Sequence, residues 1–176
     1  MNFMDFSKEY YVRILKDDDI PLIFALCTKN TQFYEHCPPF VTAESIRQDL
    51  RVLPQRKRNE PQDKYYLGYF DDAGQLVAVM DFIDHYPTAQ SGFIGFFFIG
   101  FFMVELSMQG AGVGSAIITE LCAYLHSLGY EYIRLGYVDG NKQSEAFWKK
   151  NQFTDTGLRD HTPDYTVIVM NRTLAE

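Results

Sequence analysis

The residues whose types and spacing best suggest chemistry form the run Gln109-Gly110-Ala111-Gly112-Val113-Gly114-Ser115. Alternating glycines allow the backbone to curl so that successive N–H groups point into one concavity. An apolar stretch precedes the run and a helical pattern follows it. The first turn of that helix adds unsatisfied N–H donors and the positive end of its dipole. Such a site binds phosphate or pyrophosphate without a lysine, so the run predicts a phosphorylated cofactor without saying which one.

Two other phosphate-binding loops do not fit this run. A P-loop ends in Gly-Lys-Ser or Gly-Lys-Thr, whereas this run ends in Gly114-Ser115-Ala116. A dinucleotide-binding loop needs its third glycine where Ser115 stands, and it normally follows the first strand of its fold. A glycine-rich turn that holds no ligand is the plain alternative, and the sequence leaves it open.

Two motifs in register resemble a known family. The run Gln109–Gly114, read as Q-x-x-G-x-G, is similar to the Q/R-x-x-G-x-G/A signature of the GNAT superfamily of N-acetyltransferases. Ile99–Val104 looks like the strand before that signature. Asn141–Phe153 resembles the later motif, which is built around an asparagine and a short helix. The resemblance covers about Tyr65–Gly157, whereas the first 60 residues resemble the family only in their layout of helices.

The resemblance implies a mixed α/β fold. Its central sheet would be mixed and mostly antiparallel, with helices on both faces and a splay between the strands ending near Val104 and Val138. The implied cofactor is acetyl-CoA, with CoA as the product. In the family, a strand before the loop binds the pantetheine arm through its backbone, and the loop amides hold the pyrophosphate. The residues that the resemblance assigns to the cofactor are Phe102, Met103, Val104, Gln109, Gly110, Ala111, Gly112, Val113, Gly114, Ser115 and Asn141.

The implied reaction is a direct transfer, in which a neutral amine attacks the thioester carbonyl. A backbone N–H near Met103 would stabilise the oxyanion. The family often protonates the leaving thiolate with a tyrosine, but Trp148 stands at that place, and an indole N–H is not a usable acid. Tyr137 is a candidate substitute, although a core aromatic explains it equally well. Asn141 has a plain role too, as the N-cap of the helix that follows it.

The general base is a choice among several carboxylates. Asp81 sits among apolar neighbours, where burial raises a carboxyl pKa, and Asp84 faces the other side of the same strand. Glu35 and His36 lie in the helix-rich first part, which usually forms the acceptor side in the resembling family. Glu105 could simply cap the turn before the loop. Each of these groups also has a structural explanation, as an exposed or paired charge. The candidates for catalysis are therefore Tyr137, Asp81 and Glu35.

The elements that must position these residues follow from hydrophobic patterning. Phe93–Val104 is apolar on both alternating faces, as in a strand at the middle of a covered sheet, and Gly95 and Gly100 suggest a bulge. Phe33-Tyr34 and Cys37–Phe40 either line an acceptor pocket or form a stiff loop over the core. We expect the other elements at Tyr10–Leu15 (strand), Asp17–Cys27 (helix), Thr42–Val52 (helix), Tyr65–Phe70 and Leu76–Ile83 (hairpin), Gly112–Leu128 (helix), Tyr132–Val138 (strand), Gln143–Asn151 (helix), Phe153–Leu158 and Tyr165–Met170 (strands).

Composition narrows the class of protein. A formal charge of −7 and a pI near 5.0 disfavour a nucleic-acid or anionic-membrane surface and fit a cationic amine only weakly. The longest apolar run, Gly92–Val104, is too short to span a bilayer, and Met1–Tyr10 does not resemble a signal peptide. The 3 cysteines and 4 histidines show no metal spacing, so we expect no metal. We expect one cytoplasmic domain over residues 1–176.

Two functions from different classes remain. The first is an N-acetyltransferase that acts on a small-molecule or peptide amine. The second is a GNAT-like domain that binds or senses acyl-CoA without turnover, which Trp148 favours. No nucleic acid and no membrane are expected as partners, and a homodimer is left open because closing strands of this fold often pair between subunits.

Overall fold

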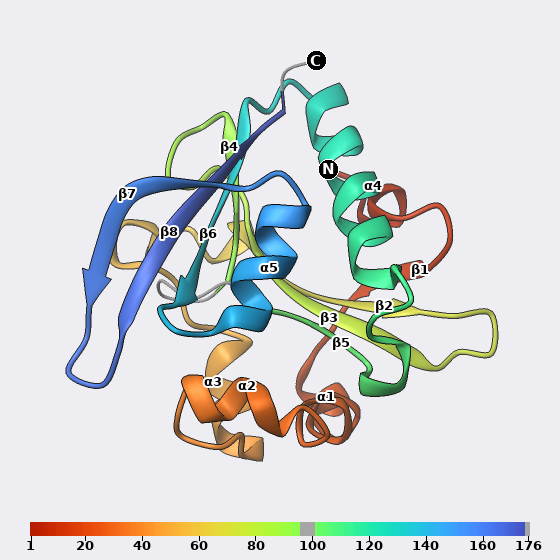
Figure 1. The fold of residues 1–176 in the computed structure, drawn as a ribbon. Coiled ribbons are helices and arrows are strands. Elements are labelled where there is room, and N and C mark those ends of the chain that lie inside the picture. Colours follow the sequence, from red (N-terminus) through yellow and green to blue (C-terminus); the bar gives the residue numbers. More distant parts are fainter. Residues whose placement is uncertain (96–100, 175–176) are drawn as a thin grey trace.

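The computed structural model describes residues 1–95 and 101–174 (Figure 1). Within these residues, one sheet of eight strands has the order β1-β2-β3-β4-β6-β8-β7, and β5 pairs with β3 off this path. The strands are β1 Tyr11–Ile14, β2 Lys64–Phe70, β3 Leu76–Ile83, β4 Ser91–Ile94, β5 Phe102–Val104, β6 Tyr132–Val138, β7 Thr154–His161 and β8 Thr166–Thr173. The α-helices are α1 Ile20–Cys27, α2 Thr31–His36, α3 Ala43–Asp49, α4 Val113–Ser127 and α5 Lys142–Lys150.

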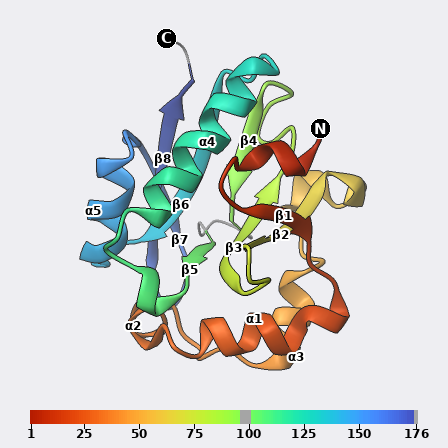
Figure 2. The ribbon, with the colours of Figure 1, turned by 90° about the vertical axis from the view of Figure 1, so that its right-hand side faces the viewer.

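The sheet is mixed and mostly antiparallel, as predicted. β4 and β6 run parallel, and the other paired strands of the described chain run antiparallel. Helices α1, α2 and α3 lie together beneath the sheet in Figures 1 and 2, while α4 and α5 lie above them. The predicted arrangement of helices on both faces is therefore confirmed.

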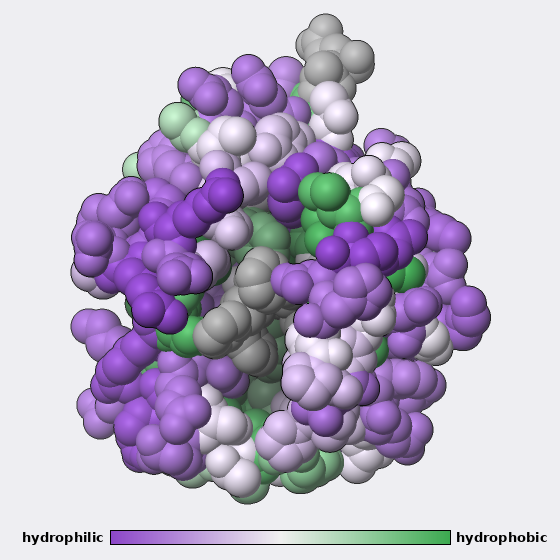
Figure 3. Space-filling view, turned by 90° about the vertical axis from the view of Figure 1, so that its left-hand side faces the viewer, coloured by the Kyte–Doolittle hydropathy of each residue, from purple (hydrophilic) through white to green (hydrophobic). Residues whose placement is uncertain are grey.

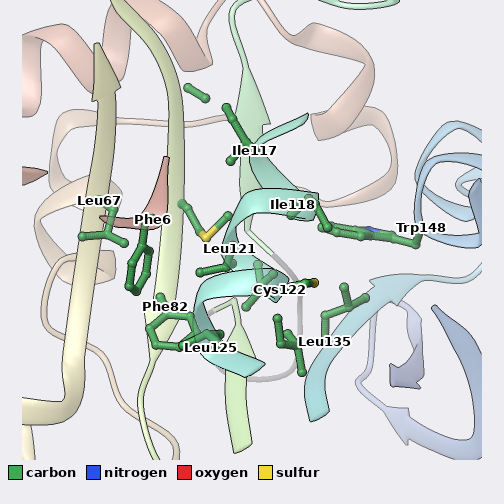
Figure 4. Close-up of a cluster of buried hydrophobic side chains, with 14 of the residues drawn as sticks. Phe6, Leu67, Phe82, Ile117, Ile118, Leu121, Cys122, Leu125, Leu135 and Trp148 are labelled. Atoms are coloured by element: carbon green, nitrogen blue, oxygen red, sulfur yellow. The ribbon is translucent and has the colours of Figure 1, made fainter. Parts of the chain in front are cut away.

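Helix α4 covers one face of the sheet because its apolar residues recur every three or four positions. Ile117, Leu121 and Leu125 are completely buried and point toward side chains of the sheet, among them Phe82 and Leu135 (Figure 4). The helix ends before Gly129, whose φ of +84° is the left-handed value that a glycine adopts after a helix. The predicted helix and its terminating glycine are both confirmed.

The other face is covered by the first three helices. Ile23 of α1 and Ile46 of α3 are buried against Tyr66, Val79 and Met103 of the sheet. Hydrophilic side chains dominate the face shown in Figure 3, with hydrophobic side chains visible in patches between them.

The prediction of one strand over Phe93–Val104 is wrong. β4 ends at Ile94 and β5 begins at Phe102, and both pair with β3. Asp81 lies at the point where β3 changes partner: its N–H donates to Phe101 O at 2.9 Å and its C=O accepts from Gly95 N at 2.8 Å. Alternating apolarity could not reveal this break, because both pieces are buried. The predicted bulge glycine at position 100 lies outside the described residues.

This break produces the predicted splay. β4 pairs with β6 over Ser91–Ile94, whereas β5 pairs with β3 and lies off the path that leads to β6. The strands ending at Val104 and Val138 therefore separate.

Some element boundaries differ from the predictions. Thr31–His36 forms the short helix α2 where only a loop or pocket lining was expected. β7 and β8 extend to His161 and Thr173, beyond the apolar residues that marked them. Polar residues continue the pairing in both cases, between β7 and β8 at His161 and between β8 and β6 at Thr173. Among the described residues, no helix combines the length and apolarity needed to cross a membrane.

Candidate functional site

The glycine loop opens directly into α4. Gly110 and Gly112 adopt φ values of +77° and +91°, and Gly112 is the N-cap residue of the helix. A Cβ built on either glycine would meet nothing within 4 Å, so the backbone has free space on that side. The first amides of α4 have no partner within the helix, as at any helix start. The loop thus presents the N–H groups and the positive helix end that phosphate binding needs.

This loop forms one wall of a cleft of about 450 Å³. β5, the start of α2 and the inner side of α5 form the other walls. The predicted residues that line the cleft are Phe102, Met103, Val104, Gln109, Gly110, Gly112, Gly114 and Ser115. Of the other predicted cofactor residues, Ala111 and Val113 belong to the same loop and helix start, and Asn141 is separate.

The Gln109 side chain fixes the loop to its surroundings. Its Nε2 donates to Val104 O at 2.9 Å and also to Asn30 Oδ1, while its Oε1 accepts from Gln143 Nε2 at 3.4 Å. Asn30, which lines the cleft and is 7% exposed, was not predicted from the sequence. An asparagine between two helices is typical of a helix end, so its partner 79 positions away left no local signal.

Along β5, the backbone N–H and C=O groups of successive residues point alternately toward β3 and away from it. Phe101 O accepts a hydrogen bond from β3 at 2.9 Å, and Glu105 N donates one to β3 at 2.7 Å (N···O). Met103 lies midway between them in the same phase of the antiparallel ladder, so its N–H and C=O face β3. Those of Phe102 and Val104 face away from β3, toward the splay. The strand register thus contradicts the expectation of a free backbone at Met103, although Met103 is among the residues that line the cleft.

Helix α5 closes the cleft with aromatic rings. Phe147 lies 4.8 Å from Trp148 and 6.0 Å from Phe102, measured between ring centroids. A Cβ at Gly114 would come within 3.0 Å of the Phe147 ring, which explains the glycine in the first turn of α4. Asn141 accepts a hydrogen bond from Ser144 N at 3.0 Å, so its expected role as an N-cap is confirmed.

Residues 24–153 match the sequence profile of the acetyltransferase (GNAT) family. The chain belongs to the GNAT family. Its predicted family resemblance is therefore confirmed. No curated protein sequence matches the chain.

Solved structures show the same GNAT fold. An acetyltransferase from Thermus thermophilus matches with a TM-score of 0.72 at 16% identity, covering 94% of this chain and 97% of that chain. Spermidine N-acetyltransferase from Vibrio cholerae, in complex with CoA and spermine, matches with a TM-score of 0.68 at 15% identity, covering 96% and 97%. Ard1 from Thermoplasma volcanium matches with a TM-score of 0.65 at 19% identity, covering 95% and 99%.

Asp81 occupies an unusual place in this GNAT sheet. It is completely buried, and its Oδ2 accepts from Lys64 Nζ at 2.5 Å. Its Oδ1 and the hydroxyl of Tyr66, which lies directly opposite on β2, have no hydrogen-bond partner among the described residues. Burial, with a smaller contribution from the charge of Asp49, raises the pKa of Asp81 to about 7 despite the nearby Lys64. The raised pKa expected for this carboxyl is therefore confirmed.

Among the described residues that line the cleft, none is one of the catalytic candidates Asp81, Tyr137 and Glu35. Tyr137 is 5% exposed in the core under α4, where burial raises its pKa. Glu35 is exposed on α2. Asp84 accepts from the Tyr130 hydroxyl on the opposite side of the sheet from Asp81, as expected, and Glu105 pairs with Lys29 at 3.0 Å. No cluster of three or more metal-binding side chains occurs in the part of the chain that the structure describes.

Proposed function

We propose that the chain is a single-domain, acetyl-CoA-dependent N-acetyltransferase that acts on a primary amine. The observation that carries this proposal is the geometry of the cleft. Gly110, Gly112, Gly114 and Ser115 line one side. Phe102 and Val104, whose backbone groups face away from β3, line the other. A pyrophosphate on the loop would let a pantetheine arm lie along β5 like an added strand.

In this proposal, backbone groups of β5 bind the acyl donor and stabilise the oxyanion. The C=O of Val104 already accepts from Gln109, so the outward N–H of Val104 and both outward groups of Phe102 are the ones offered to the substrate. One of these N–H groups would stabilise the oxyanion that forms when the amine attacks the thioester carbonyl. This assignment replaces Met103, whose backbone faces β3.

The acid–base part of the proposal places Asp81 first. The amine nitrogen forms a bond to the acetyl carbon and loses a proton, while the C–S bond breaks and its electrons leave on sulfur. Asp81, with a pKa of about 7, would take the proton near neutral pH. The thiolate needs no strong acid, because the pKa of a thiol is ordinarily about 8.5. Tyr137 and Glu35 remain second candidates, as acid and base.

A catalytically weak acyl-CoA-binding domain is the second candidate function. The observation in its favour is Trp148, which is 4% exposed and packs 5.2 Å from Phe153 at the place where the family often has a tyrosine. A Trp148→Tyr variant tests this directly. Higher turnover in the variant would mean that the missing acid limits the reaction, whereas unchanged or lost turnover would mean that Trp148 is there for packing.

Thermal unfolding with acetyl-CoA, CoA, ATP and NAD in parallel tests the cofactor. A ligand at 100 times its dissociation constant adds about 2.7 kcal/mol, which raises the midpoint by roughly 5–10 °C in a domain of this size. We expect that rise with acetyl-CoA and CoA alone. A rise with ATP or NAD, or with none of the four, would reject the proposal.

Thiol release from acetyl-CoA separates the two functions. A panel of small amines and peptides with free amino groups serves as acceptors. Acceptor-dependent release supports the transferase. Binding of CoA without release across the whole panel supports the binding domain. The acceptor itself, a homodimer and a cytoplasmic location stay predictions.

A further inference from the structure

Asn30 joins two helices and reaches the cofactor loop. Its backbone N–H donates to Cys27 O at 3.0 Å and its C=O accepts from Phe33 N at 3.1 Å, so it lies in the turn after α1 and is the N-cap residue of α2. Its Nδ2 donates to Leu26 O at 3.1 Å, and its Oδ1 accepts from Gln109 Nε2. A short buried side chain thus carries both a local helix-end bond and a bond to the first residue of the loop.

Both ends of the Gln109 carboxamide are engaged. Its two N–H groups are divided between Asn30 and the carbonyl of Val104, and its oxygen accepts from Gln143. A planar amide held at three points cannot rotate without breaking a hydrogen bond. Without Asn30, one N–H would lose its acceptor and the amide could turn. Since Gln109 is the first residue of the glycine loop, directly after the 3-10 turn Leu106–Met108 that follows β5, its orientation bears on where the following amides point.

A second tie links the same two segments. Lys29 Nζ lies 3.0 Å from Glu105 Oε2, but the lysine side chain is 54% exposed. An exposed ion pair of this kind holds a segment only weakly. The part-buried Asn30–Gln109 bond is therefore the stronger connection between the α1–α2 turn and the loop.

We infer that Asn30 is a positioning residue for the cofactor loop, acting through Gln109 rather than by touching the cofactor. The α1–α2 turn then sets the direction of the loop amides, and the affinity for CoA depends on a residue from the other side of the cleft. This inference rests on the proposed function, because CoA is the ligand whose binding it describes.

A double-mutant cycle tests the inference. The dissociation constant of CoA is measured by calorimetry for the wild type, Asn30→Ala, Gln109→Ala and the double variant. Asn151→Ala is the matched control, because Asn151 is 5% exposed and donates from Nδ2 to the carbonyl four residues before it at 2.8 Å, as Asn30 does, but at the end of α5. Should Asn30→Ala fail to fold, Asn30→Ser replaces it, since serine can cap the helix but is too short to hold Gln109.

We expect Asn30→Ala to weaken CoA binding by about 5–10-fold in the wild-type background, the usual effect of one hydrogen bond. In the Gln109→Ala background the same change should have no further effect. Asn151→Ala should lower the unfolding midpoint similarly and leave CoA binding unchanged.

Four results would be decisive against it. Unchanged CoA binding in Asn30→Ala, or an equal loss in both backgrounds, would reduce Asn30 to a helix-end residue. An equal loss of binding in Asn151→Ala would make the effect one of general stability. If the wild type does not bind CoA at all, the proposed function fails, and the inference fails with it.

Discussion

Replacing Gly112 by alanine separates backbone strain from cofactor binding. Its φ is +91°, and an added Cβ meets no atom within 4 Å, so the substitution creates strain but no clash. An L-residue in the left-handed region costs about 1–2 kcal/mol. Gly129 offers the same test without a ligand site, because its φ is +84°, its Cβ position is equally open, and it lies at the opposite end of α4.

The two variants should therefore lose similar stability. At roughly 2–4 °C per kcal/mol for a domain of this size, each midpoint should fall by roughly 2–8 °C. Only Gly112→Ala should also lose the rise that CoA produces, because relaxing the strained φ turns the loop amides away from the phosphates. Thermal unfolding with and without CoA measures both quantities.

Two outcomes would refute this reasoning. If Gly112→Ala keeps the full CoA-induced rise, the loop amides do not hold the cofactor. If Gly129→Ala loses that rise as well, the effect comes from the stability of α4 and not from the loop.

Three further predictions concern Tyr66, Asp49 and Gly114. Tyr66→Phe removes a hydroxyl that has no partner among the described residues, so the unfolding midpoint should stay or rise by roughly 2–4 °C, and a rise in the KM for the amine would place the acceptor beside Asp81. Asp49→Asn should flatten the pH dependence of stability between about pH 4 and 6. Burial raises the pKa of Asp49 from 3.8 to about 6, so the folded state holds the proton more tightly than the unfolded state does. The free energy of unfolding of the wild type therefore falls by up to about 3 kcal/mol as the pH rises through that window. Urea titrations at several pH values measure it. Gly114→Ala should gain about 1 kcal/mol in helix propensity, but its Cβ should displace the Phe147 ring. We expect little change in the unfolding midpoint and weaker CoA binding by calorimetry. Unchanged binding would contradict the contact.

Local signals were enough for much of the fold and the loop. The hairpin β2–β3, α4 and β6 lie where periodicity and turn residues predicted them, because each carries its own pattern and its own terminating residue. Gly112 was identified by its place before a helix, and its left-handed φ supports that interpretation. Helix α2 was missed because six residues without a side-chain cap give too short a pattern.

Long-range contacts were the part that sequence could not supply. The bond from Asn30 to Gln109 and the ion pair of Lys64 with Asp81 join residues that share no local pattern. The break between β4 and β5 is not visible in the pattern of apolar residues over Phe93–Val104. One long buried strand and two short buried strands have the same apolar composition. The phase of β5, which turns the backbone of Met103 toward β3, is set by pairing and not by residue type.

The position of Asp81 connects the break to the chemistry. The N–H and C=O of an antiparallel strand residue point to the same side and normally meet one partner residue. Those of Asp81 meet two: its N–H donates to Phe101 O and its C=O accepts from Gly95 N, on either side of the break. The same residue therefore marks where β5 leaves β4 and where the backbone of Phe102 becomes free to meet a substrate. Its carboxyl group lies on the face covered by α1, α2 and α3, opposite Tyr66. The break between β4 and β5 thus opens the sheet for an acyl donor. The same break places the Asp81 carboxylate, with its raised pKa, on the face covered by α1, α2 and α3, where we expect the amine.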